Sequence, residues 1–188
     1  DKKTFRIIIS HLKLTKKEND YDLKFFKKIK IKSLAFGYKN EKNLLGPINL
    51  DLTKGDIIGI TGKNGSGKST LIELICGFLK PQKGNIFVDG QPLKHNLYTI
   101  ISYVTQKPFF FNSSIQENIT FCKSKKEIRL NDYKFALSLS GTQNFINQKK
   151  GTDELVILDN AKNLSGGQRQ KIAIARALYK NSDIIILD

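Results

Sequence analysis

One glycine-rich segment of this chain has residue types and spacing suited to holding phosphate groups. Gly62-Lys63-Asn64-Gly65-Ser66-Gly67-Lys68-Ser69-Thr70 fits the pattern G-x-x-x-x-G-K-[ST]. Glycines allow the backbone to turn tightly, so that N–H groups point inward at phosphate oxygens, and the following helix N-terminus adds partial positive charge. We therefore predict that residues 62–70 bind ATP. In this prediction Lys68 neutralises the β- and γ-phosphates, and the Ser69 hydroxyl binds Mg²⁺.

The elements predicted on either side of this segment are the ones that such a loop requires. Ile57-Ile58-Gly59-Ile60 is predicted to be a buried strand. Apolar residues at helical spacing then predict a buried helix face that ends by Pro81. These apolar residues are Leu71, Ile72, Leu74, Ile75, Phe78 and Leu79. The order strand, loop, helix supports phosphate binding more strongly than the pattern alone.

A second segment, Leu164-Ser165-Gly166-Gly167-Gln168, is predicted to begin another helix. Ser165 is suited to be the N-cap, and Gln168, three residues later, can complete a capping box. Two adjacent glycines in a first helical turn weaken a helix unless another backbone or ligand must come close. A phosphate is the obvious candidate, because exposed N–H groups and the helix dipole form an anion site.

This second segment, residues 164–168, resembles the LSGGQ signature that, with the phosphate loop, defines ABC-type ATPases. The resemblance covers residues 62–188. It implies a P-loop α/β cassette with a mixed sheet, a small antiparallel β subdomain and a helical signature subdomain from about 107 to 170. It also implies a head-to-tail dimer, in which Ser165, Gly166, Gly167 and Gln168 contact the ATP held by a second cassette.

Other positions follow the family pattern with less specificity. Asp188, after the apolar run Ile184–Leu187, resembles the Walker B aspartate that holds Mg²⁺. Gln106 resembles the Q-loop glutamine that touches Mg²⁺ and the attacking water. Tyr38 resembles the aromatic residue that stacks on adenine, although an aromatic residue in a strand needs no ligand. Asp159 falls where exporters carry a glutamate that contacts the membrane domains, and Asn160-Ala161 departs from that pattern.

The remaining chain is expected to alternate strands and helices around one α/β core. Strands are predicted in the antiparallel region 31–60, at 86–88, at 100–104 and at 184–187, and helices within 116–148 and at 166–179. Residues 1–30 are interpreted as a linker from an upstream membrane domain with room for an extra strand, and 31–188 as a partial cassette. Both ends are interpreted as cuts. The family's catalytic glutamate and histidine are expected beyond Asp188, so the chain alone should hydrolyse ATP poorly or not at all.

Composition limits the other possibilities. The net charge of +15 invites a nucleic-acid interpretation, but the lysines scatter along the whole length, as a lysine- and asparagine-rich proteome would also produce. Cys76 and Cys122 have no metal-ligand or redox spacing and are expected to be buried thiols. The sequence contains no run of about 18 to 20 apolar residues, the length that a membrane-spanning helix needs. His11 and His95 are most simply surface residues.

The type of ABC protein is indicated by the segment Phe110 to Ile119, which is similar to an exporter pattern after the Q-loop. This resemblance implies an exporter or flippase whose membrane domain shares the full-length chain, placing the cassette at the cytoplasmic face of the inner membrane. The alternative is a soluble ABC ATPase that acts on nucleic acid or ribosomes, for which the basic charge would be a footprint. A third possibility is a nucleotide-binding regulatory module without hydrolysis. The transported substrate is not encoded in these residues.

Overall fold

The chain divides into two compact units in a computed structural model. Unit 1 contains Asp1–Ile101 and Asp183–Ile186, and unit 2 contains Ser102–Ser182 and Leu187–Asp188. The structure describes residues 7–8, 27–37, 45–93, 97, 100–122, 124–148 and 155–188. Tyr38, His11 and His95 lie outside these residues, as does most of the predicted linker, so those predictions stay predictions.

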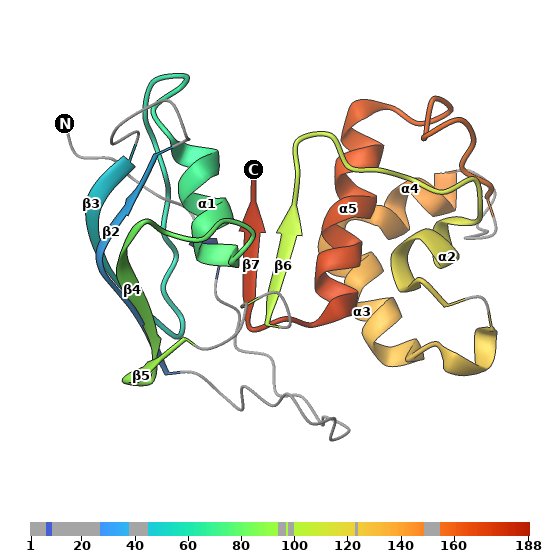
Figure 1. The fold of residues 1–188 in the computed structure, drawn as a ribbon. Helices are drawn as coiled ribbons and strands as arrows, with labels where there is room; N and C mark the ends of the chain where they lie inside the picture. Colours follow the sequence, from blue (N-terminus) through green and yellow to red (C-terminus); the bar gives the residue numbers. More distant parts are fainter. Residues whose placement is uncertain are drawn as a thin grey trace. The chain divides into compact units, whose positions relative to one another are not determined.

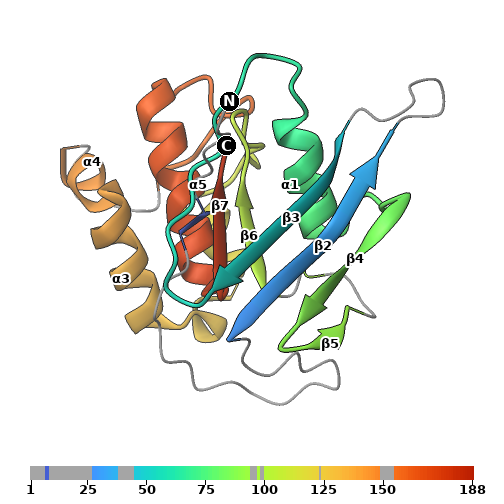
Figure 2. The ribbon, with the colours of Figure 1, turned by 90° about the vertical axis from the view of Figure 1, so that its left-hand side faces the viewer.

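Unit 1 contains the expected antiparallel sheet. Its strands are β2 (Lys28–Phe36), β3 (Leu45–Thr53), β4 (Lys83–Val88) and β5 (Gln91–Pro92). They lie in the order β3-β2-β4-β5, with every neighbouring pair antiparallel (Figure 2). The alternating sequence of β2 buries Ile29 and Ile31 and exposes Lys28, Lys30 and Lys32, as a sheet with one buried face requires.

A bulge in β2 changes this alternation at Ser33. Between Ile31 and Leu34 the strand advances three residues while its partner β3 moves two, from Leu50 to Ile48. Ser33 adopts a positive φ of 49°, and Leu34 therefore points into the core with no exposed surface. On the other side of β2, Gly84 of β4 fits closely against the bulge. A Cβ atom at Gly84 would lie 2.4 Å from the Ser33 carbonyl oxygen.

A second sheet contains β1 (Ile7–Ile8), β7 (Ile184–Leu187) and β6 (Ile101–Val104), in the order β1-β7-β6. β1 pairs with β7 antiparallel. The amides of residues 184 and 188 donate to the carbonyl oxygens of residues 100 and 104, so β6 and β7 advance together and run parallel. The predicted strands at 100–104 and 184–187 are thus confirmed, and the α/β class is correct.

The predicted buried strand at residues 57–60 is wrong. The structure assigns a single β-bridge residue at Ile57 and no strand over residues 57–60, and the Ile57 side chain is 68% exposed. An apolar sequence is not enough for a strand, because its N–H and C=O groups also need a partner edge.

Helix α1 (Lys68–Cys76) follows the phosphate loop as predicted, but it ends earlier than Pro81. Gly77 adopts a left-handed conformation with φ of 80°, and the amides of residues 77 and 78 donate to carbonyl oxygens of the last helical turn. Leu71, Ile72, Leu74 and Ile75 are buried as expected. Phe78 lies beyond the helix and is 59% exposed, so its assignment to the buried face is wrong.

Unit 2 is built around α5 (Gly166–Lys180), which matches the predicted helix at 166–179. α2 (Ile115–Thr120), α3 (Leu130–Ser140) and α4 (Thr142–Gln148) all contact α5 (Figure 1). A short 3₁₀ helix covers Lys125–Glu127. The predicted helical region 116–148 is therefore interrupted. Phe121 and Gly141 take left-handed conformations at the ends of α2 and α3, which stops each helix.

The two cysteines differ in exposure. Cys76 is buried in α1, as predicted, whereas Cys122 is partly exposed, so its assignment as a buried thiol is wrong. Cys122 follows the left-handed Phe121 at the end of α2, where the chain leaves the helix at the surface. Its sulfur lies 3.4 Å from the carbonyl oxygen of Thr120.

Candidate nucleotide-binding site

The phosphate loop, residues 62–70, curls around the ammonium group of its own lysine. Lys68 Nζ donates to the carbonyl oxygen of Gly62 at 2.9 Å and to that of Lys63 at 3.0 Å. The Ser66 amide also donates to the Lys63 carbonyl oxygen, at 3.1 Å. The lysine that begins α1 is therefore held against the start of the loop. A cation kept at the mouth of a loop and at a helix N-terminus is suited to an anionic group.

The structure explains why glycine occupies three positions of the loop. A Cβ atom at Gly62 would lie 2.6 Å from Ser66 Oγ. Gly65 and Gly67 have φ angles of 77° and 87°, which L-residues with side chains rarely adopt. At Gly65 no atom lies within 4 Å of an added Cβ position, so its requirement is conformational and its surroundings are open.

Ser66 provides a direct test of whether the loop fits a phosphate. Its Oγ is buried and has no hydrogen-bond partner among the described residues. With Gly67 and Lys68 it borders a cavity of about 360 Å³ whose other side is formed by β3 residues that include Asn49. An unsatisfied buried hydroxyl costs free energy unless a ligand or water completes it. The hydroxyl and the Lys68 ammonium are both suited to phosphate oxygens.

The helix start at residues 164–168, here called the signature segment, is confirmed in detail. Ser165 is the N-cap of α5, and its Oγ accepts from the Gln168 amide at 3.3 Å. Gln168 Oε1 accepts from the Ser165 amide at 2.8 Å, which completes the predicted capping box. Ser165, Gly166 and Gly167 are exposed, and Gln168 is half-buried.

The two glycines of the signature segment are not required by packing within the chain. A Cβ atom at Gly167 would meet nothing within 4 Å, and one at Gly166 would only reach the flexible end of Arg169 at 4.0 Å. Neither has a positive φ. Their lack of a side chain is therefore explained neither by folding strain nor by internal contacts, and the helix N-terminus they form is open to an external group.

Helix α5 is anchored at its middle by Arg176, which the sequence analysis did not single out. The guanidinium donates to Asn118 O at 2.5 Å, to Asn118 Oδ1 at 2.7 Å and to the Phe109 carbonyl oxygen. It also lies 4.5 Å from the centre of the Phe110 ring. Burial lowers the pKa of Arg176 to about 10. These contacts join the signature helix to the segment that follows Gln106.

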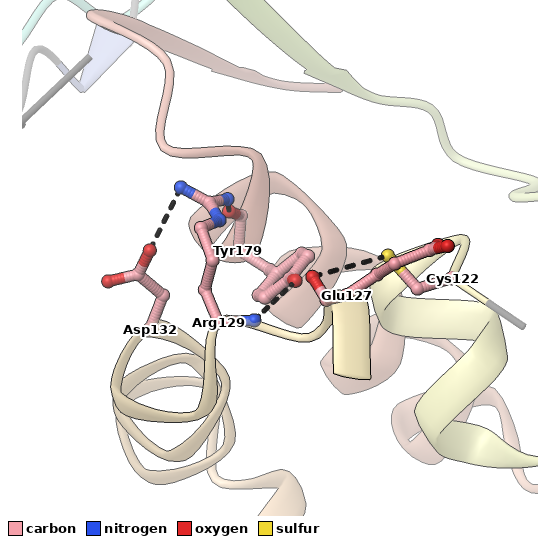
Figure 3. A network of polar contacts seen from close by, with 5 residues as sticks. All are labelled: Cys122, Glu127, Arg129, Asp132 and Tyr179. Carbon is pink, nitrogen blue, oxygen red and sulfur yellow. Dashed lines mark hydrogen bonds and ion pairs between the residues drawn. The ribbon is translucent and has the colours of Figure 1, made fainter. Parts of the chain in front are cut away.

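The C-terminal end of α5 is held by Arg129 at the start of α3 (Figure 3). The Arg129 amide donates to the Tyr179 hydroxyl at 3.1 Å, and its guanidinium donates to the Tyr179 carbonyl oxygen. Asp132 pairs with the same guanidinium at 2.9 Å. A basic side chain on a helix's last carbonyl groups stabilises that terminus. The middle and the C-terminal end of α5 are thus fixed within unit 2.

Asp188 and Gln106 occupy the predicted positions after parallel strands. Asp188 follows β7 and Gln106 lies two residues after β6, and both are exposed. The Asp188 amide donates to the Val104 carbonyl oxygen at 3.0 Å. The Tyr103 hydroxyl donates to Asp188 Oδ2 at 2.9 Å, a contact that the sequence analysis missed. Asp188 is therefore held beside the strand that leads to Gln106.

The predicted site residues fall into two sets. The phosphate loop belongs to unit 1, whereas Gln106, Asp188 and the signature segment belong to unit 2. Among the described residues, no group of three or more His, Cys, Asp or Glu side chains could hold a metal ion. Ser69 and Asp188 nevertheless provide oxygen ligands of the kind that Mg²⁺ prefers. Within the described part of the chain, no helix is long and apolar enough to cross a membrane.

Asp159, which was predicted to contact membrane domains, lies in an unusual turn. Asp159, Asn160 and Ala161 all have positive φ angles, of 48°, 53° and 66°. Asn160 Oδ1 accepts from the Phe110 amide at 2.9 Å, which gives the residue that departs from the family pattern a structural role. Asp159 itself is exposed, and its contact with a membrane domain stays a prediction.

Comparisons with known proteins agree with this arrangement. The profile of the ABC transporter family matches residues 45–188. An ATP-dependent lipid A-core flippase of Saccharophagus degradans is 36% identical over 166 residues, which are 86% of this chain and 28% of the flippase. The alpha-hemolysin translocation ATP-binding protein HlyB of Escherichia coli O157:H7 is 39% identical over 165 residues, 85% of this chain and 23% of HlyB.

A solved structure of a bacterial Atm1-family ABC exporter with ATP bound matches with a TM-score of 0.74 and 26% identity. The match covers 87% of this chain and 29% of the exporter chain. The phosphate loop, the signature segment and these matches define an ATP-binding cassette. The chain belongs to the ABC transporter family, and it spans less than a third of the length of each of these relatives.

Proposed function

We propose that this chain is the ATP-hydrolysing part of a membrane exporter or flippase. The observation that carries the proposal is the phosphate loop: Lys68 is held at the loop start, and the buried Ser66 hydroxyl lacks a partner among the described residues. In the proposed function these groups and the loop amides bind the triphosphate. Tyr38 stacks on adenine.

Magnesium would be held by oxygen atoms of Ser69, Gln106 and Asp188 and would neutralise charge that develops on the phosphates. Lys68 would contribute a further positive charge to the same phosphate groups. Catalysis by this chain's residues is therefore mostly positioning and charge stabilisation. Loss of Lys68 should harm function more than loss of Tyr38, because only Lys68 interacts with the transferred group.

The signature segment supports a head-to-tail dimer with a second cassette. Gly166 and Gly167 leave an exposed helix N-terminus whose glycines are not needed internally. A γ-phosphate bound to the loop of the partner cassette is the proposed occupant, so that two ATP molecules are enclosed between two cassettes. Closing and reopening of this pair would move a membrane domain, in the same full-length chain, between its inward- and outward-facing states at the cytoplasmic face of the membrane.

The relatives named for lipid flipping and hemolysin translocation favour transport over action on nucleic acid. The charge of +15 is the one observation that favours the alternative. Addition of RNA or DNA to the ATPase assay separates the two, because strong stimulation would indicate a nucleic-acid-dependent ATPase, whereas no response fits a transporter.

The decisive experiment compares Lys68→Ala with Lys80→Ala in the full-length protein. Lys80 is an exposed lysine of the same unit outside the loop, so it controls for the loss of one positive charge. A hydrogen bond to a charged group contributes about 1.5–3 kcal/mol, which corresponds to a loss of about 10- to 100-fold in ATP affinity for Lys68→Ala. The control should change affinity less than about twofold. Equal affinity in the two variants would refute the assignment of Lys68.

A further inference from the structure

The carboxylate of Asp188 is held by one hydroxyl group from the neighbouring strand. Tyr103 Oη donates to Asp188 Oδ2 at 2.9 Å. Among the described residues, Tyr103 is the only one that forms a hydrogen bond or ion pair with the Asp188 side chain. Both residues belong to unit 2, so the contact lies within one compact unit.

Tyr103 is itself placed by a firmly held strand. The residues on either side of it, Ser102 and Val104, are buried. Ser102 Oγ hydrogen-bonds to Ser182 Oγ at 2.8 Å and to the Ala177 carbonyl oxygen at 3.3 Å. The Val104 carbonyl oxygen accepts from the Asp188 amide. Since a tyrosine has only two side-chain torsions, a fixed backbone at this position leaves its hydroxyl little freedom.

A carboxylate that binds a metal ion works best when its orientation is fixed before the ion arrives. Groups that hydrogen-bond to a metal ligand orient it, and their loss typically lowers metal affinity by about 10- to 100-fold. A hydroxyl that donates to Oδ2 leaves Oδ1 and the remaining lone pairs available. Magnesium commonly uses one or two carboxylates and keeps several water molecules, so one oriented carboxylate is a suitable contribution.

We propose that Tyr103 is a positioning residue that orients the Asp188 carboxylate for the magnesium ion of bound ATP. This inference rests on the proposed function, since it takes Asp188 as a metal ligand. Tyr103 touches neither the nucleotide nor the ion in this proposal, and it acts only through Asp188. Its removal should therefore weaken metal binding without weakening metal-free nucleotide binding.

The test uses Tyr103→Phe in the full-length protein, because this change removes one oxygen atom and keeps the ring. Binding of Mn²⁺ in the presence of a non-hydrolysable ATP analogue is followed by the electron paramagnetic resonance signal of free Mn²⁺. Nucleotide affinity is measured separately in EDTA. Tyr179→Phe is the matched control, because it removes a hydroxyl of the same unit that bonds to Arg129 and not to Asp188. Asp188→Asn serves as the reference for loss of the ligand.

The expected result is a loss of Mn²⁺ affinity of about 10-fold in Tyr103→Phe, with unchanged nucleotide affinity in EDTA and an unchanged control. If Asp188→Asn weakens Mn²⁺ binding and Tyr103→Phe does not, the positioning role is overturned while the metal site stands. If Tyr103→Phe lowers metal and metal-free nucleotide binding equally, the role is general packing and the inference fails. If Asp188→Asn leaves Mn²⁺ binding unchanged, the metal assignment in the proposed function is itself wrong.

Discussion

Replacement of Arg176 by alanine should destabilise unit 2 more than any other single change to a charged residue described above. The change leaves two acceptors without their donor, the carbonyl oxygens of Asn118 and Phe109, and it removes one of the two donors to Asn118 Oδ1, which keeps the Phe111 amide. Asn118 has no exposed surface, so water cannot replace the guanidinium there without rearrangement. Each unsatisfied buried group costs about 1–3 kcal/mol, and a lost cation–π contact adds about 0.5–1 kcal/mol.

These contributions are not additive, so we take the total cost as about 2–4 kcal/mol. We therefore expect Arg176→Ala to lower the local free energy of unfolding by about that amount. Arg176→Lys keeps the charge but cannot reproduce the planar fork, so its loss should be intermediate. Lys162→Ala, at an exposed position of the same unit, is the control and should remain within about 0.5 kcal/mol of the wild type.

Hydrogen–deuterium exchange in peptides from α2 and α5 measures this loss in the full-length protein. A change of about 2 kcal/mol or more corresponds to at least about 30-fold faster exchange where exchange proceeds through this opening. A loss below about 1 kcal/mol in Arg176→Ala would refute the assignment of Arg176 as the anchor of α5.

The effect should also be independent of pH between 6 and 8.5. Burial lowers the pKa of Arg176 to about 10 in the folded chain, below its value in the unfolded chain, so the group is charged in both states throughout this range. Because the pKa is lower in the folded state, a contribution of Arg176 to the pH dependence would appear only as the pH rises above about 10. There the folded state would lose its buried charge first and gain relative stability. A strong pH dependence near neutrality would therefore have to come from other groups.

Two further predictions concern glycines and a helix cap. Gly84→Ala should destabilise unit 1 by more than 1 kcal/mol, because the new Cβ would lie 2.4 Å from the Ser33 carbonyl oxygen at a φ of 85°. Gly167→Ala should instead be neutral or stabilising by about 0.5–1 kcal/mol, because alanine favours the helix. Thermal unfolding without nucleotide measures both, and a destabilised Gly167→Ala would show that this glycine has a structural role. Ser165→Ala should cost about 0.5–2 kcal/mol through loss of the N-cap, seen as faster amide exchange in the first turn of α5, and unchanged exchange would contradict the capping box.

Sequence patterns were most accurate for helix ends that are determined by residues close to them in the chain. The start of α5 was found correctly because Ser165 and Gln168 satisfy each other's backbone partners within four residues. The end of α1 was placed too late because Pro81 was taken as the stop, although Gly77 ends the helix in a left-handed conformation. The break at Phe121 has no glycine to mark it, so it could not be anticipated from propensity.

Features that depend on distant partners could not be predicted in the same way. The apolar run at 57–60 satisfies the sequence pattern of a buried strand, but strand formation also requires hydrogen-bond partners on a neighbouring strand, which the local sequence does not specify. Similarly, Tyr103 and Asp188 are 85 residues apart in the chain, and Arg176 and Asn118 are 58 apart. Neither residue pair forms a motif, because contact between them follows only from tertiary packing.

The signature segment shows how residues needed for folding can be separated from those kept for another reason. Ser165 and Gln168 would be favoured at this helix start even in a protein that binds nothing, since each satisfies a backbone amide. Gly167 weakens the same turn, has no positive φ and would tolerate a Cβ atom without contact. Gly84 is different, because the bulge in β2 excludes any side chain there. A glycine that costs helix stability and meets no internal contact is best explained by the close approach of an external group, and at an exposed helix N-terminus that group is expected to be anionic.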